Sequence, residues 1–137
     1  AAKPEQNHAA APRFDGELSE LVATYDELRG QLATAVAAAR KAHGIRVFKK
    51  QMVQQRLADA AIAVYTMLCV LQRAKGELAA GKSSEDSLML CRYSVERLAR
   101  SARRSLAGQE DNSDDLASRL AVAACTGIGE CLEEKTA

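Results

Sequence analysis

The chain has 137 residues, a formal net charge of +1, 47% hydrophobic residues and no Trp. Its length suggests one domain with a modest core, and its apolar content excludes a chain that is disordered throughout. The near-neutral total charge predicts neither nucleic acid nor a membrane as a partner. Both prolines, Pro4 and Pro12, lie near the N-terminus, so proline interrupts no helix in the rest of the chain.

An N-terminal linker, residues 1–14, is predicted to precede the periodic part of the chain. This stretch is rich in Ala with Pro, Gln and Asn, and it has no apolar segment of the kind found in secretory signals. A single helical domain is predicted over residues 15–137.

Two helices are predicted before residue 81. The first spans residues 15–43, where apolar residues recur at steps of three and four along one face, and Gly44 ends it. The second and longest spans residues 45–80. Its inner stripe is predicted to be Ile45, Phe48, Met52, Leu57, Ala61, Val64, Leu68, Leu71 and Leu78.

Within the second helix, residues 60–71 are apolar except for Thr66. A membrane span needs about 20 such residues, and this run is well short of that. Arg56, Asp59 and Arg73 also lie close to it on either side. Because a helix that is apolar nearly all round is normally surrounded by other helices, we expect this segment at the centre of a bundle.

Two further helices follow, each with its own start signal. Ser83 or Ser84 is expected to cap the third helix, and Asn112 or Ser113 the fourth, while Gly108 separates the two. The inner face of the fourth helix is predicted to be Leu116, Leu120, Ala123, Gly127 and Cys131. Four amphipathic helices with short connections predict an all-α fold, a four-helix up-down bundle.

No catalytic, cofactor-binding or metal-binding residue is predicted. His8 and His43 have no ligands at a metal spacing, and the sequence contains no Gly-rich phosphate loop. Asp59 lies beside the apolar run. It is expected to form a structural ion pair with Arg56 or with an arginine of a neighbouring helix.

The four cysteines form no CxxC pair and are predicted to be reduced, small core residues in a reducing compartment. They are Cys69, Cys91, Cys125 and Cys131.

Charge is distributed unevenly, with seven basic and two acidic residues in 45–82 and two basic and seven acidic residues in 108–137. An anionic membrane surface or an acidic protein is one candidate partner for the basic residues. Internal salt bridges to the acidic first and fourth helices are the alternative. Nucleic acid is not expected, because few aromatic residues accompany the basic ones. The candidate docking residues are Arg97, Arg100, Arg103, Arg104, Lys49 and Lys50.

The segment from Gln55 to Ala74 resembles the C-terminal helical domain of very-long-chain acyl-CoA dehydrogenases, including acyl-CoA dehydrogenase family member 9. The shared pattern is QRLAD at residues 55–59, Ala-Ile at 61–62, Tyr65, Met67 and the VLxRA ending at 70–74. A following LMLCRYSVE at residues 88–96 also agrees. The similarity is clear from about residue 18 to residue 97 and weak beyond.

The resemblance implies that FAD and the catalytic glutamate belong to a separate catalytic domain of a parent enzyme, and it carries no catalytic residue onto this chain. It implies a docking module that packs on that catalytic domain, with roles in dimer assembly and in membrane or partner contact. The compartment it implies is the bacterial cytoplasm or the mitochondrial matrix. Two alternatives stay open: a free-standing four-helix interaction module, and a small enzyme with its site in the bundle core.

Overall fold

The computed structural model describes the backbone of residues 18–136 and the side chains of residues 18–126. Over this range the chain is helical, and the predicted all-α fold with four long helices is confirmed. The predicted linker, residues 1–14, lies outside the described residues. The elements in chain order are α1 (Ser19–His43), the 3-10 helix η2 (Gly44–Lys49), α2 (Gln51–Ala79), α3 (Glu85–Ala107) and α4 (Asp114–Thr136).

The connection between α1 and α2 differs from the prediction of one helix over residues 45–80. Gly44 ends α1 as expected, with a positive φ of 53° that glycine adopts readily. The chain then forms η2, and α2 begins only at Gln51. The Gln54 side chain donates a hydrogen bond of 2.9 Å to the Val47 carbonyl, which ties the turn to the first turn of α2. The chain therefore reverses direction in residues that were predicted to form the start of the second helix.

The start of α3 follows the predicted capping logic. The Ser84 hydroxyl accepts a hydrogen bond of 3.1 Å from the Ser87 backbone N–H, and the Ser87 hydroxyl accepts one of 3.0 Å from the Ser84 N–H. This reciprocal pair satisfies two donors that the helix itself leaves free. At α4 the Asn112 side chain accepts from the Asp114 N–H at 3.1 Å.

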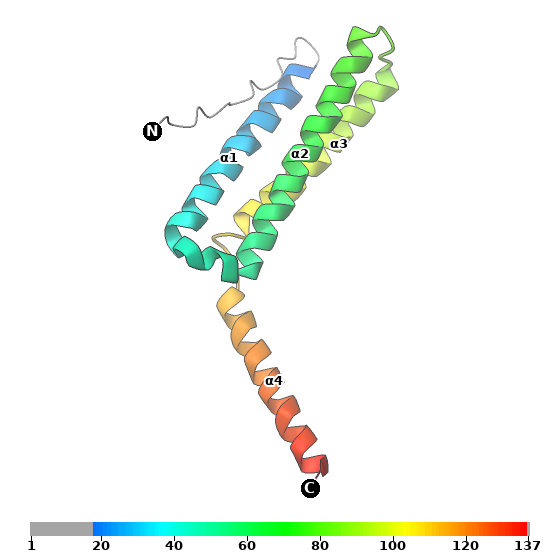
Figure 1. Ribbon diagram of the computed structural model, residues 1–137. Coiled ribbons are helices and arrows are strands. Elements are labelled where there is room, and N and C mark those ends of the chain that lie inside the picture. The colour runs from blue at the N-terminus through cyan, green and yellow to red at the C-terminus, as the bar shows by residue number, and fades with distance from the viewer. Residues whose placement is uncertain (1–17, 137) are drawn as a thin grey trace, which may run out of the picture.

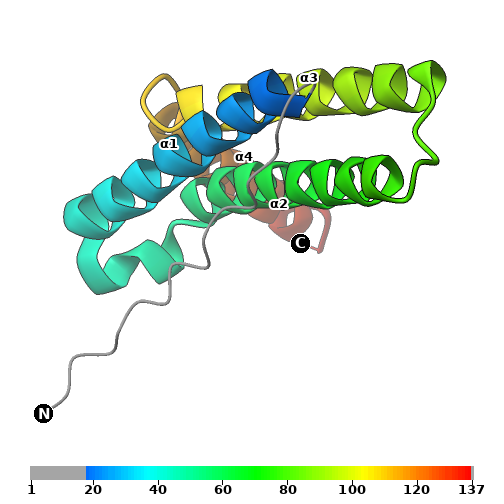
Figure 2. The same ribbon diagram turned by 90° about the horizontal axis from the view of Figure 1, so that it is seen from above.

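The first three helices lie side by side with alternating directions (Figure 1), and α1 lies over the pair formed by α2 and α3 (Figure 2). Their inner faces form one apolar core, and none of the buried residues in the described part of the chain is polar or charged. Small residues let the helices approach closely, while a few large side chains fill the space between them. The largest fully buried side chains are Leu18, Leu28, Met67, Leu71 and Val95.

The apolar run in α2 is buried on one face only. Ala63, Val64 and Met67 are buried, whereas Ile62 and Tyr65 are 64% and 67% exposed. The expectation that other helices surround this segment is therefore wrong, because α1 and α3 cover only one side of α2. By length and composition α2 would suffice to cross a membrane. Its inner face packs in the core, and about a third of its most apolar segment is buried (33%).

The fourth helix leaves the bundle. It begins at the end where α1 meets α2 and runs outward (Figure 1), and its described part packs along none of the other helices. Leu116 and Leu120 were predicted to face the core, but they are 56% and 61% exposed, and Ala123 is exposed too. The predicted inner residues Gly127 and Cys131 lie outside the described side chains.

Candidate docking site

The four arginines predicted for docking all lie on α3, and the structure divides them into two groups. Arg103 pairs with Glu27 of α1 at 3.4 Å, so it joins two helices of the bundle as the salt-bridge alternative expected. Arg97, Arg100 and Arg104 are exposed, and within the described residues they form no ion pair. Three of the four cations are therefore available to an outside partner.

These three arginines continue an apolar stripe on the outer side of α3. Leu90 and Tyr93 are 66% and 56% exposed, and they lie three or four residues apart along the same helical face as Arg97, Arg100 and Arg104. We call these five residues the α3 face. It combines exposed apolar area with concentrated positive charge, which suits an acidic protein surface with apolar residues beside the acids.

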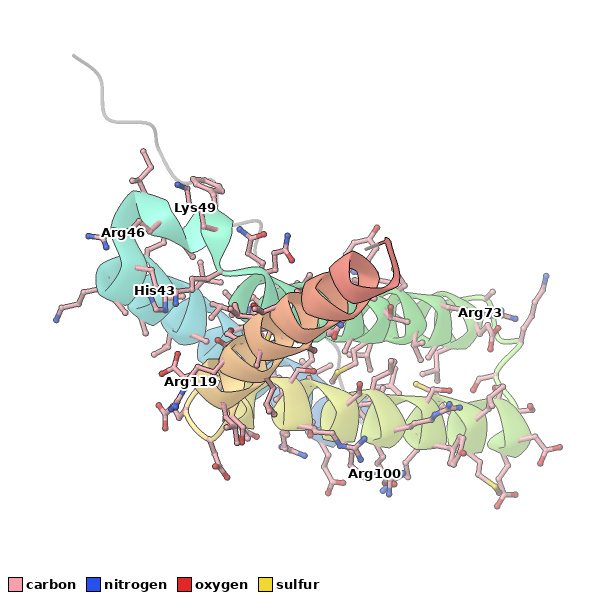
Figure 3. The ribbon with its side chains drawn as sticks, turned by 90° about the horizontal axis from the view of Figure 1, so that it is seen from below. His43, Arg46, Lys49, Arg73, Arg100 and Arg119 are labelled. Carbon is pink, nitrogen blue, oxygen red and sulfur yellow. The ribbon has the colours of Figure 1, made fainter. Side chains whose placement is uncertain are left out.

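Lys49 and Lys50 form a separate basic cluster and do not join the α3 arginines. Lys49 lies at the end of η2 and Lys50 links it to α2. Figure 3 shows Lys49 on η2 and Arg100 on the far side of α3, pointing away from each other. The structure therefore splits the predicted docking residues between two surfaces.

Two large apolar side chains accompany the lysines. Ile45 and Phe48 of η2 are 86% and 75% exposed, more than any other large hydrophobic side chain in the described chain. Beside them lies an open groove of about 750 Å³, whose lining includes Val36, Val47 and Leu57. Ile45 and Phe48 were predicted to face the core because both match the apolar period of α2. The missed signal was the short glycine-led connection that turns them outward.

The junction of α4 with the bundle is held by an ion pair that was not predicted. Arg56 of α2 donates two hydrogen bonds to the Asp114 carboxylate, and the bond from Nη1 to Oδ2 measures 2.8 Å. Both side chains are about three-quarters buried, with exposed fractions of 21% and 24%. A forked arginine–carboxylate contact defines direction as well as distance, so it orients the first turn of α4.

Two further contacts fix the same junction. The Gln109 side chain donates a hydrogen bond of 3.2 Å to the Val53 carbonyl. At Gly108 an added Cβ would lie 3.2 Å from Cδ and Nε of Arg56. Glycine therefore allows the arginine to lie against the backbone at the end of α3.

The ion pair shifts both of its titrating groups. The hydrogen bonds from Arg56 lower the pKa of Asp114, against a smaller opposing effect of burial, and the charges of Arg56 and Lys50 lower it further. The hydrogen bond to Asp114 raises the pKa of Arg56. Each group therefore favours the charged form of the other.

Two predicted roles are corrected by these positions. Asp59 is exposed and forms no ion pair within the described part of the chain, because Arg56 bonds to Asp114 instead.

Of the cysteines, Cys91 is buried as predicted. Burial raises the pKa of its thiol, with a further contribution from the charge of Glu77. Cys69 and Cys125 are exposed rather than in the core, and Cys131 lies outside the described side chains.

The described residues contain no group of three or more His, Cys, Asp or Glu side chains that could hold a metal ion. Catalysis in a helical bundle usually depends on paired carboxylates or histidines that project into the core. The described core of this chain is apolar throughout. The described surface offers two exposed areas of mixed apolar and basic character.

Comparison with known proteins identifies the family of this chain. Residues 16–127 match the family model described as ACAD9/ACADV, C-terminal domain. The very long-chain specific acyl-CoA dehydrogenase, mitochondrial, of Bos taurus is 37% identical over 83 residues. That match covers 59% of this chain but only 13% of the bovine protein. No solved structure matches.

The family model covers every described helix of the bundle and the first half of α4. The chain therefore belongs to the family of ACAD9/ACADV C-terminal domains.

Proposed function

We propose that this chain is a non-catalytic docking domain that packs on the catalytic domain of an FAD-dependent acyl-CoA dehydrogenase through its α3 face. The observation that carries the proposal is the exposure of the five residues of the α3 face. Because the family is one of C-terminal domains, we infer that the chain is part of a larger enzyme. Within such an enzyme, a row of this kind would be covered by another part of the protein.

Catalysis in this proposal belongs to the catalytic domain of the parent. FAD and the catalytic base lie there, and this chain contributes neither. The matched segment makes up only 13% of the bovine relative, which leaves ample length for a separate catalytic domain. Because the name of that relative places it in mitochondria, we propose a reducing compartment, either the mitochondrial matrix or, for a bacterial parent, the cytoplasm.

The chemistry of the α3 face determines the expected binding partner. Arg97, Arg100 and Arg104 need carboxylates opposite them, and Leu90 and Tyr93 need apolar area beside those carboxylates. An acidic protein surface supplies both. Anionic lipid would satisfy the arginines, so the same experiment includes vesicles as a second outcome.

The test is calorimetric titration of this chain into the parent's catalytic domain, expressed from the upstream reading frame without residues 16–127. We expect saturable binding that weakens as salt rises, because exposed charges are screened. Arg100→Glu should weaken binding by on the order of tenfold or more, since it places like charges opposite each other.

Lys82→Glu is the matched control. It reverses one charge on the α2–α3 turn, away from the α3 face, and should leave the affinity unchanged. Equal loss in both variants, or no loss in either, would reject the α3 face. Binding to anionic vesicles in place of the catalytic domain would assign the face to a membrane instead.

The second candidate is a free-standing interaction module. The described structure favours it in one respect: α1, α2 and α3 enclose a core of their own without help from another domain. An upstream reading frame that encodes no flavin-dependent domain would favour this candidate.

A further inference from the structure

The pair formed by α2 and α3 has one side that α1 leaves uncovered. On α2, Leu57 lines an open groove together with Val36 of α1. Arg56 and Asp59 lie one helical turn apart on another side of α2, and there Arg56 lies against Gly108 at the end of α3. The uncovered side of the pair therefore begins where α3 ends and the chain continues to α4.

The same side continues along the pair as a groove with small and apolar residues. Val70 follows Asp59 by about three helical turns, so the two residues lie on one side of α2. Val70 lines a groove of about 260 Å³ together with Leu90 and Ser94 of α3. Ser101 lies about two turns along α3 from Ser94 and is exposed. Small side chains of this kind leave room for a further helix to approach.

The fourth helix has the length and the apolar face to cover this side. It has 23 residues, as α3 has, so each helix is about 34 Å long. Leu116, Leu120 and Ala123 share one face of α4 and are exposed. Because α4 starts beside the end of α3, an α4 that folded back antiparallel to α3 would run along the whole uncovered side. Its apolar face would then lie over Thr66 and Ser101.

Two carboxylates compete for Arg56 at the start of this side. In the structure Arg56 donates two hydrogen bonds to Asp114, the first residue of α4, and α4 is directed away from the bundle (Figure 1). Asp59 is exposed and forms no ion pair within the described residues. A folded-back α4 would cover Asp59, and a covered carboxylate needs a hydrogen-bonded cation. Arg56, one turn away on the same helix, is placed to supply it.

We propose that α4 has two positions, selected by the carboxylate that Arg56 binds. Bound to Asp114, Arg56 holds α4 directed outward. Bound to Asp59, it releases the first turn of α4, which packs back along α2 and α3 as the fourth helix of the bundle. The folded-back position buries Leu116 and Leu120 and gives up the forked ion pair. Because α4 is joined to this side by a short connection, its effective concentration there exceeds that of a helix from another molecule.

The folded-back position restricts the α3 face. Leu90 belongs both to the groove between α2 and α3 and to the α3 face, so α4 in this position covers part of the proposed docking surface. The outward position leaves the α3 face open. This consequence rests on the proposed docking function, whereas the movement of α4 itself does not.

The test measures the position of α4 within the full chain. Pulsed electron spin resonance gives the distance between spin labels on native Cys125 of α4 and on Lys82→Cys at the turn between α2 and α3. Cys69→Ser, Cys91→Ala and Cys131→Ser leave only these two positions to be labelled. Dilution with unlabelled chain removes distances between molecules. With Asp114 intact we expect a long distance, because α4 is directed away from that turn.

Three variants separate the two positions. Asp114→Ala removes the outward partner of Arg56 and should shorten the main distance by on the order of 20 Å, because α4 then runs toward the labelled turn. Adding Leu116→Ser and Leu120→Ser should restore the long distance, because folding back no longer buries apolar area. The control is Asp115→Ala, which removes a neighbouring carboxylate that forms no ion pair in the described residues and should keep the long distance. Circular dichroism should show that every variant keeps its helices.

An Asp114→Ala chain with the long distance of the original would overturn the proposal. A short distance that persists after Leu116→Ser and Leu120→Ser would overturn it too, since the apolar face would then not hold α4 in place. These distances are measured without the catalytic domain. Failure of docking in the calorimetric titration therefore leaves them unchanged, and the two proposals fail separately.

Discussion

The partner of Arg56 is set by how the helices connect rather than by its neighbours in sequence. Asp59 lies three residues away, one helical turn along, and was the expected partner. The side chain instead reaches Asp114, 58 residues further along the chain, because the end of α3 and the start of α4 meet the start of α2. Charge type and approximate burial can be predicted from the sequence. The choice between two carboxylates depends on tertiary placement.

Removing one partner of this pair should destabilise the chain and free α4. In Arg56→Ala the Asp114 carboxylate loses both of its arginine hydrogen bonds, and Asp114→Asn removes the charge that Arg56 contacts. A double-mutant cycle followed by urea unfolding should show a favourable coupling energy between the two residues. A coupling energy of zero would mean that the ion pair between Arg56 and Asp114 does not stabilise the fold.

The same pair predicts a pH dependence with a definite sign. Because the pKa of Asp114 is lowered from its ordinary value of 3.8 in the folded chain, its contribution is fully present above that value. The contribution is lost as pH falls through the lower folded-state pKa. The stability difference between the original chain and Asp114→Asn should therefore be constant near neutrality and shrink below 3.8. A difference that grows on acidification would contradict the assignment.

Among the elements, α2 shows what apolar periodicity can and cannot determine. Its existence and its end near Gly81 were predicted within a few residues, but its start was predicted six residues too early. Its inner face was only partly predicted: Val64 and Leu71 are buried, but Ile45 and Phe48 are exposed. Few polar residues mark the solvent-facing side of such a helix. The sequence therefore does not determine which side of the helix faces the core. The η2 turn also breaks the period that appeared to continue from residue 45.

Two residues of similar size in the apolar run of α2, Leu71 and Ile62, differ in burial. Leu71 is fully buried, and Leu71→Ala should lower the free energy of unfolding by about 2–5 kcal/mol because it leaves a cavity among well-packed neighbours. Ile62→Ala, on the exposed face of the same helix, should change it by no more than about 0.5 kcal/mol. Urea unfolding measures both. Equal losses would mean that a further surface covers Ile62.

For the whole molecule, the helix count and the fold class were predicted, but the placement of α4 was not. Its apolar face at Leu116 and Leu120 has the pattern of a bundle helix, yet it leaves the bundle. An amphipathic stripe indicates that a helix face will be covered and does not indicate by which surface. The uneven charge of the chain led to the prediction of one set of docking residues, which stays a prediction. The structure divides these residues between the α3 face and the two lysines at the end of η2, Lys49 and Lys50.

The expectation that this chain holds no flavin rests on the whole molecule rather than on any single residue. A flavin needs a pocket with polar groups placed to hold its phosphates, ribose and ring. The core formed by α1, α2 and α3 has no buried polar or charged residue in its described part. Acyl-CoA oxidation also requires a positioned base, and Asp59, which precedes the apolar run in the sequence, is exposed.

We propose above all that this chain acts by docking and carries no chemistry of its own. The most direct measurement is the visible absorbance of the purified chain after incubation with FAD and removal of unbound flavin, followed by an acyl-CoA-dependent dye-reduction assay. We expect a colourless protein and no dye reduction. A stoichiometric flavin complex, or dye reduction that depends on acyl-CoA, would contradict the account.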